Sequence, residues 1–161
     1  MKTLIFKLLL LFILLNVHST LYAQIMENKD TGYEQPVLET ETRRYCMTLE
    51  LKDDPKLITE YETWHQAKNI WKEIPAGIRQ VGVIDSEIYR FGTTLFMILT
   101  VPTDFNFEEQ MTTLADLPRQ AEWEDLMTKY QATKPGASSA EKWQKMERIF
   151  KLPEYNEQSD R

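Results

Sequence analysis

The order of hydrophobic patterns along the chain predicts an α+β fold whose elements follow one another as β-α-β-β-α-β. Apolar residues alternate from Tyr45 to Leu51, which is the period of a strand, and then recur with helical spacing up to Ile78. Two further strand-like runs are joined at Gly92, and a second helical stretch precedes a last strand-like run.

The first strand and the first helical stretch are separated by a helix start signal. The strand alternates the apolar Tyr45, Met47, Leu49 and Leu51 with Cys46, Thr48 and Glu50. Asp54 is a good capping residue, and Pro55 suits the first helical position. The helical spacing then includes Leu57, Ile58, Tyr61, His65, Ile70, Trp71, Ile74 and Ile78. A break is expected at 67–69, and Pro75 either kinks the second part or marks a new helix start.

The middle of the chain has the pattern of a hairpin, with strands at 80–91 and 93–101. The second strand is apolar on both faces, so we expect it to be covered on both sides, and Pro102 ends it. One helix face is then formed by Phe107, Met111 and Leu114, and a further helix that opens at Pro118 carries Trp123, Leu126, Met127 and Tyr130. A polar loop at 132–139 leads to a last strand at 143–152.

Four strands and helices in this order predict a ferredoxin-like sandwich, in which one antiparallel sheet carries helices on one face. A chain of this size has no second layer for the other face. We therefore expect either a pocket there or a dimer in which two sheets face each other.

Length and composition exclude several classes of protein. The 161 residues suit one domain with a targeting segment. The formal net charge of -6 argues against a nucleic-acid partner, which needs clustered lysine and arginine. Cys46 is the only cysteine, which excludes an internal disulfide and a cysteine-rich metal site, and nothing nearby marks it as a reactive thiolate.

Residues 1–23 have the layout of a secretory signal peptide. Lys2 and Lys7 precede an apolar run at 8–15, and Ala23 is a small residue at a plausible cleavage point. The apolar run is too short for a comfortable membrane span, so we expect a cleaved signal, a periplasmic or secreted protein and no membrane contact afterwards. The alternative is an uncleaved N-terminal anchor. Residues 24–42 then form a flexible arm, 43–152 the domain and 153–161 a polar tail.

His65 is the only histidine left after cleavage, so any histidine chemistry must take place there. This excludes a metal site built from two or three histidines within one chain, and no glycine-rich loop for a phosphate or a dinucleotide is present. Tyr61 and His65 are four residues apart and lie on one side of the helix, with Trp71 following. An imidazole among aromatic rings suits a sugar, although spacing alone favours a histidine at the edge of the core.

Two other sets of residues could bind the hydroxyl groups of a sugar. Glu87 alternates with Asp85 and Tyr89 on one face of the hairpin, where the alternative is a solvent-facing strand edge. Trp123 beside Glu124 is either a core anchor or a platform for a sugar ring.

Several segments between Arg44 and Leu152 together form a specific pattern. They are Arg44-Tyr45-Cys46-Met47, Tyr61-x-x-x-His65, Trp71 with Glu73, Glu87-Ile88-Tyr89-Arg90, Leu95-Phe96-Met97, Trp123-Glu124-x-Leu126-Met127 and Met146-Glu147-Arg148-Ile149-Phe150. In this order they resemble the L-rhamnose mutarotase family.

The resemblance implies a dimeric α/β barrel that uses no cofactor and interconverts the α and β anomers of a 6-deoxy sugar. It places the family's proton donor at His65 and its substrate-contacting tyrosine at Tyr61. Trp123 keeps the first member of a sugar-contacting tryptophan pair, while Glu124 replaces the second. A further sugar-contacting tyrosine of the bacterial rhamnose enzymes falls near Ser86 and is missing, which leaves L-rhamnose, L-fucose or another deoxy sugar open.

We therefore predict a homodimeric aldose mutarotase, an isomerase, in which protonated His65 donates to the ring oxygen and Tyr61 orients the sugar. Trp123 and Trp71 would supply stacking, and Glu87 and Glu124 are candidates for binding the sugar and for the base. The alternatives are an L-fucose mutarotase, a non-catalytic sugar-binding module on the same fold, and a small oxidoreductase-like protein of the dimeric barrel class that holds haem.

Overall fold

The computed structural model describes residues 32–35, 37–133, 137 and 139–152. The predicted signal peptide, its cleavage point, residues 24–31 and 36 of the arm, and the tail at 153–161 lie outside these residues. Residues Thr40–Arg161 form a compact unit separate from Met1–Glu39, and all described strands and helices belong to it. In the described part of the chain, no helix has the length and apolar character needed to span a membrane.

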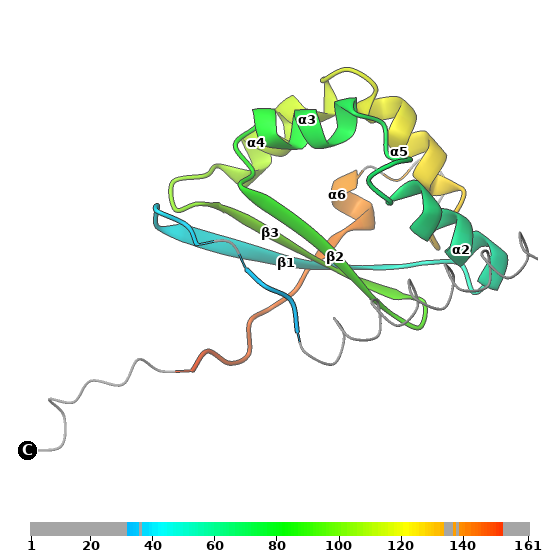
Figure 1. Cartoon of the computed structure of the whole chain (residues 1–161), viewed down its shortest axis with the longest axis horizontal. Coiled ribbons are helices and arrows are strands. Elements are labelled where there is room, and N and C mark those ends of the chain that lie inside the picture. The colour runs from blue at the N-terminus through cyan, green and yellow to red at the C-terminus, as the bar shows by residue number, and fades with distance from the viewer. Residues whose placement is uncertain (1–31, 36, 134–136, 138, 153–161) are drawn as a thin grey trace, which may run out of the picture. The chain divides into compact units, whose positions relative to one another are not determined.

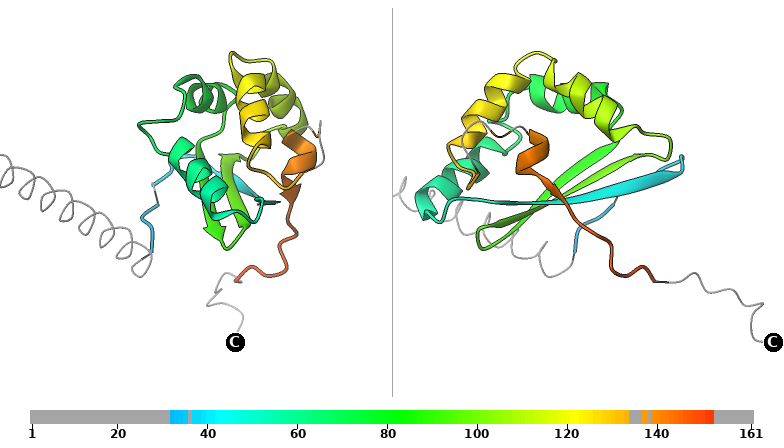
Figure 2. Two further views of the ribbon diagram at one scale, coloured as in Figure 1. Left: turned by 90° about the vertical axis from the view of Figure 1, so that its right-hand side faces the viewer. Right: turned by 180° about the vertical axis from the view of Figure 1, so that it is seen from behind.

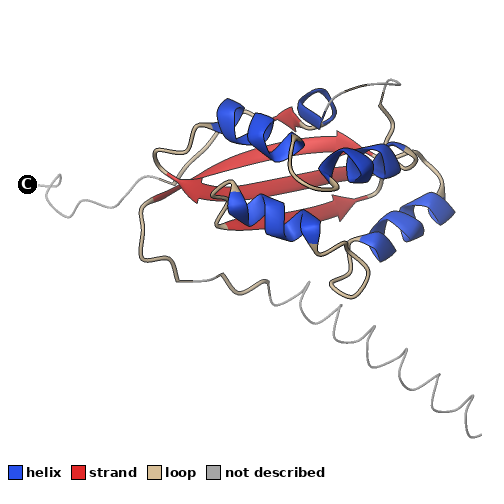
Figure 3. Ribbon diagram, turned by 90° about the horizontal axis from the view of Figure 1, so that it is seen from above, coloured by secondary structure: helices blue, strands red, loops and turns tan. Residues whose placement is uncertain are grey.

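The described elements form one antiparallel sheet with helices on one side. In chain order they are β1 (Thr42–Glu50), α2 (Pro55–Trp64), α3 (Glu73–Gln80), β2 (Asp85–Phe91), β3 (Thr94–Pro102), α4 (Phe107–Ala115), α5 (Gln120–Thr128), α6 (Ser139–Lys142) and β4 (Gln144–Lys145). The strand order is β2-β3-β1-β4, and each neighbouring pair is antiparallel. Figures 1 and 3 show the helices on one face of this sheet. The predicted α+β fold with a ferredoxin-like element order is confirmed.

The register of the two central strands sets which side chains face the helices. Leu49 pairs with Leu95, and both are buried in one cluster with residues of α2, α3 and α5. Because side chains alternate along a strand, Cys46 and its partner Ile98 point to the opposite face. Cys46 is exposed and Ile98 is half-buried, so the second face of β3 is less covered than its sequence predicts.

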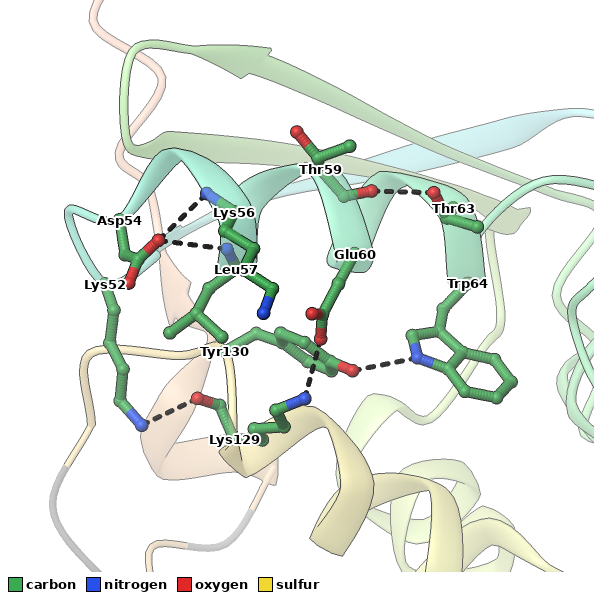
Figure 4. Close-up of polar contacts among 10 residues, drawn as sticks. All are labelled: Lys52, Asp54, Lys56, Leu57, Thr59, Glu60, Thr63, Trp64, Lys129 and Tyr130. Carbon is green, nitrogen blue, oxygen red and sulfur yellow. Dashed lines mark hydrogen bonds and ion pairs between the residues drawn. The ribbon is translucent and has the colours of Figure 1, made fainter.

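The start of α2 follows the predicted signal. The Asp54 carboxylate accepts the backbone N–H groups of Lys56 and Leu57 at 2.8 and 3.3 Å, as Figure 4 shows. Pro55 is the first helical residue, where its missing N–H has no helical partner to lose. Pro75 lies in the first turn of α3, so it marks the new helix start and not a kink.

The strand predicted at 80–91 begins only at Asp85. Helix α3 runs to Gln80, and Gly82 with a φ of 89° ends it. The Gly82 N–H donates to the Arg79 carbonyl and the Val83 N–H to the Ile78 carbonyl, which is a Schellman motif. The apolar Val81 and Val83 are therefore buried core residues in a turn and not strand residues.

The end of the domain differs most from the prediction. Helix α5 begins at Gln120 and not at Pro118, because Arg119 has a left-handed backbone conformation. The last strand is only Gln144–Lys145, paired with Met47 and Thr48, and residues 146–152 have no regular structure. Ile149 and Phe150 are 93% and 71% exposed.

Candidate active site

His65 lies at the end of α2, and its ring folds back over the last helical turn. The ring Nδ1 is 2.8 Å from the carbonyl oxygen of Tyr61, which also accepts the His65 backbone N–H at 3.3 Å. Because a carbonyl only accepts hydrogen bonds, Nδ1 carries the proton in this arrangement. The neutral imidazole therefore has its lone pair at Nε2.

Aromatic rings from three parts of the chain surround this imidazole. The Tyr61 ring of α2 lies 4.1 Å from the His65 ring, and the Trp123 ring of α5 lies 5.4 Å from it. Trp71, in the connection between α2 and α3, packs against Trp123 at 5.5 Å. The structure thus brings together four residues that the sequence nominated: Tyr61, His65, Trp71 and Trp123. Tyr61 and Trp123 are 3% and 6% exposed and pack within the cluster, whereas His65 and Trp71 are half-buried.

Burial changes the proton affinity of both titratable rings. Desolvation lowers the pKa of His65 below its usual value, and the hydrogen bond to the Tyr61 carbonyl only partly opposes this. Desolvation raises the pKa of the Tyr61 phenol, and the negative charge of Glu124 adds to the rise. Tyr61 therefore stays un-ionised at any physiological pH. His65 favours the neutral form, which disfavours the protonated resting imidazole that we expected from the sequence.

Glu124 follows Trp123 on α5 and is held by a buried lysine. The Lys142 ammonium lies 3.2 Å from the Glu124 carboxylate, 3.1 Å from the Glu124 carbonyl and 2.8 Å from the Thr128 hydroxyl. The Lys142 side chain is 3% exposed, whereas that of Glu124 is 37% exposed. Figure 2 shows α6, which carries Lys142, beside α5. The carboxylate is thus fixed near Tyr61 while it keeps access to solvent.

Glu87 is not part of this cluster. It pairs with Ile98, so its side chain lies on the sheet face opposite the helices, where the Tyr89 hydroxyl donates to its carboxylate at 2.8 Å. Ser86, Ile88 and Arg90 occupy the helix-facing positions of β2, and Arg90 pairs with Glu62 of α2 at 2.7 Å. Glu87 and His65 of one chain therefore cannot bind the same small sugar, which corrects the expected role of Glu87.

Two residues near the cluster have no counterpart in the sequence prediction. Lys142 lies on α6, which falls at the border of the predicted loop and last strand, and no spacing pattern links it to Glu124. The guanidinium carbon of Arg119 lies 3.7 Å from the centre of the Trp71 ring. Its only sequence signal is its place between Pro118 and a helical pattern. Among the described residues, no group of three or more histidine, cysteine or acidic side chains could hold a metal ion.

A separate shallow groove of about 430 Å³ lies between α2 and α5. Its lining consists of Thr59, Glu60, Thr63, Trp64, Leu126, Lys129 and Tyr130. Figure 4 shows that its polar groups pair with one another, since Lys129 contacts Glu60 at 2.6 Å and the Trp64 ring N–H donates to the Tyr130 hydroxyl at 2.8 Å. These contacts join the two helices that carry the site, and neither His65 nor Trp123 lines the groove.

Comparison with known proteins identifies the family. The model of the L-rhamnose mutarotase family matches residues 44–152, which is most of the chain. The chain belongs to the L-rhamnose mutarotase family. Members of this family are aldose mutarotases, so the chain is a carbohydrate isomerase by family.

Individual proteins that are similar to this chain support the same assignment. An L-fucose mutarotase of Xanthomonas campestris pv. campestris is 39% identical over 112 residues, which covers 70% of this chain and 90% of that protein. A UPF0734 protein of Dictyostelium discoideum is 31% identical over 120 residues, covering 72% and 94%. The crystal structure of an L-rhamnose mutarotase from Formosa agariphila matches with a TM-score of 0.52 at 21% identity, covering 69% of this chain and 99% of that one. That structural likeness supports the α+β fold.

Proposed function

We propose that the protein interconverts the α and β anomers of L-rhamnose or a related 6-deoxy sugar, with His65 as the proton-transfer residue. The observation that carries the proposal is the position of the His65 imidazole, whose Nδ1 lies 2.8 Å from the Tyr61 carbonyl and whose ring packs against Tyr61 and Trp123. The 39% identity to an L-fucose mutarotase supports L-fucose as a second candidate substrate.

The proposed reaction transfers a single proton through His65 and uses no cofactor. Nε2 of His65 accepts the proton of the anomeric hydroxyl, the bond between C1 and the ring oxygen breaks, and C1 becomes an aldehyde. The same Nε2–H then donates its proton to the released ring oxygen. After rotation about the C1–C2 bond, the steps run in reverse on the other face of the aldehyde, so atoms and protons balance.

Other residues of the cluster would hold the sugar during these steps. Tyr61 stays protonated because burial raises its pKa, so its hydroxyl can donate a hydrogen bond to a sugar oxygen that carries developing charge. Trp123 and Trp71 offer aromatic rings to the apolar face of the sugar. Glu124, held by Lys142, is a fixed acceptor for a sugar hydroxyl.

Saturation-transfer NMR on purified residues 24–161 tests the proposed activity. With L-rhamnose, the α/β exchange rate should rise in proportion to protein concentration, and a parallel series with L-fucose ranks the two sugars. Binding of either sugar without faster exchange would select the non-catalytic binding module. No binding and no exchange with folded protein would reject both assignments, and the haem alternative predicts a visible absorption band after haem is added.

We also propose that the active form is a homodimer that covers the open face of the sheet. Ile98 of β3 is half-buried on that face, and Phe91, Ile149, Phe150 and Leu152 are strongly exposed. A contiguous exposed apolar patch is the mark of an interaction surface, and the proposed dimer would join these side chains into one. Light scattering should give twice the mass of one chain, and Ile149→Glu with Phe150→Glu should give one chain. A wild-type monomer would contradict the proposal.

We propose further that the protein acts outside the cytoplasm after removal of residues 1–23. There it would equilibrate anomers that glycoside hydrolases release from deoxy-sugar polysaccharides before the sugar is taken up. N-terminal sequencing of the protein from a periplasmic or secreted fraction should begin near Gln24. A protein that still begins at Met1 would contradict cleavage.

A further inference from the structure

Arg119 has a backbone conformation that arginine rarely adopts. Its φ and ψ are 63° and 2°, and no other described residue except glycine has a positive φ. The left-handed conformation costs an L-residue with a Cβ atom energy that glycine avoids. Residues held in such conformations often lie at functional sites, so the outlier itself needs an explanation.

The conformation of Arg119 connects two parts of the sugar site. Its carbonyl accepts the Trp123 backbone N–H at 3.0 Å, which forms the first turn of α5. Its guanidinium carbon lies 3.7 Å from the centre of the Trp71 ring, and its Nε lies 3.4 Å from Glu122. Because φ sets the direction in which Cβ leaves the backbone, the left-handed conformation lets one residue both begin α5 and reach Trp71.

Trp71 depends on its neighbours for its orientation. It lies outside any helix or strand, in the connection that follows α2. The Arg119 guanidinium stacks on its ring, and the Trp123 ring meets it at an interplanar angle of 69°. Trp123 in turn contacts His65 at an angle of 68°. These contacts form one continuous row of planar groups that ends at the proton-transfer residue. In order, the row is Arg119, Trp71, Trp123 and His65.

We propose that Arg119 is a positioning residue for sugar binding, which fixes the Trp71 ring against Trp123 by stacking its guanidinium on it. The inference rests on the proposed function of the His65 cluster. A planar guanidinium suits this task, because it stacks on an indole while its N–H groups stay available at the edge for Glu122 and water. The stack on Trp71, and not the backbone, accounts for an arginine at a position that favours glycine.

The test replaces Arg119 with residues that tolerate the left-handed conformation. Arg119→Asn and Arg119→Gly should keep or raise the melting temperature, because both residues adopt this conformation more readily. Their KM for sugar anomer exchange should rise roughly two- to fivefold, with kcat nearly unchanged, since an exposed cation–π contact contributes about this factor. Arg119→Lys keeps the charge without the planar stack and should also raise KM.

The matched control is Glu122→Gln, which removes the other partner of Arg119 and leaves the stack on Trp71. It should keep the wild-type KM, because an exposed pair at 3.4 Å contributes little. A wild-type KM in Arg119→Asn and Arg119→Gly would overturn the inference. A wild-type KM together with a lower melting temperature would indicate a purely structural role. A wild-type protein that does not accelerate exchange would instead reject the proposed function itself.

Discussion

Replacement of His65 by alanine should slow anomer exchange by roughly 10²–10⁴-fold while the protein stays folded. The expected effect is large because no other histidine is present after residue 23, and the neighbouring Tyr61 phenol cannot replace it as a base, since burial raises its pKa. His65 is half-buried at the end of α2, so its loss removes no strand or helix. Exchange rates by NMR and the melting temperature measure the two effects separately.

Gln66→Ala is the matched control for this variant. Gln66 is the next residue along the chain and is exposed, so its truncation should leave the exchange rate unchanged. A His65→Ala protein with the wild-type exchange rate would falsify the role of His65, and the search for the proton acceptor would then move to Glu124.

The pH dependence of the wild-type rate tests which form of His65 acts first. The neutral imidazole is the active form in the proposed reaction, and burial lowers the pKa of His65. The rate should therefore be constant between pH 7 and 8 and stay high at the usual histidine pKa of about 6.5. It should fall only at lower pH, as Nε2 becomes protonated. A rate that rises on acidification through this range would favour a protonated His65 as the initial donor.

The fold could be predicted from the sequence because its main signals are local. Alternation in β1, the Asp54-Pro55 start of α2 and the turn at Gly92 each depend on residues close together in the chain. The errors lie where distant contacts decide the structure. Residues 143–152 look like a strand, but only Gln144–Lys145 pair with β1. The Met146 N–H still donates to the Cys46 carbonyl at 2.8 Å, and the chain then leaves the edge of β1, which continues to Thr42.

The contrast between local signals and distant contacts also explains which site residues could be predicted from the sequence. Tyr61 and His65 could be paired because four residues span one helical turn, and Trp71 and Trp123 could be nominated as aromatic residues. Alternation correctly grouped Glu87 with Asp85 and Tyr89 on one face of β2, but it could not tell which face meets the helices. The other face carries Ile88 and Arg90 and is no more apolar, so the sequence of β2 does not show which face is buried. Only the register of β2 with β3 shows that Glu87 points away from the helices.

Replacement of Glu124 by alanine should destabilise the protein by about 3 kcal/mol, because it leaves the Lys142 ammonium buried without its counter-ion. The value lies at the low end of the range for broken buried pairs, since the Glu124 carbonyl and the Thr128 hydroxyl still accept from the ammonium. Lys142→Met should cost less, because methionine fills the same space and the Glu124 carboxylate, 37% exposed, can be solvated. Urea denaturation measures both changes in the free energy of unfolding.

The double variant Glu124→Ala with Lys142→Met tests whether the unpaired buried lysine causes the loss of stability in Glu124→Ala. It should recover most of the loss seen in Glu124→Ala alone, because no unpaired charge is left in the interior. The exposed pair between Lys145 and Glu108 at 2.7 Å is the matched control. A double-mutant cycle on this pair should give a coupling free energy of about 1 kcal/mol or less. Additive losses at Glu124 and Lys142 would mean that the two side chains act independently. In that case Lys142 would not hold the Glu124 carboxylate beside Tyr61, and the proposed sugar acceptor would lack a fixed position.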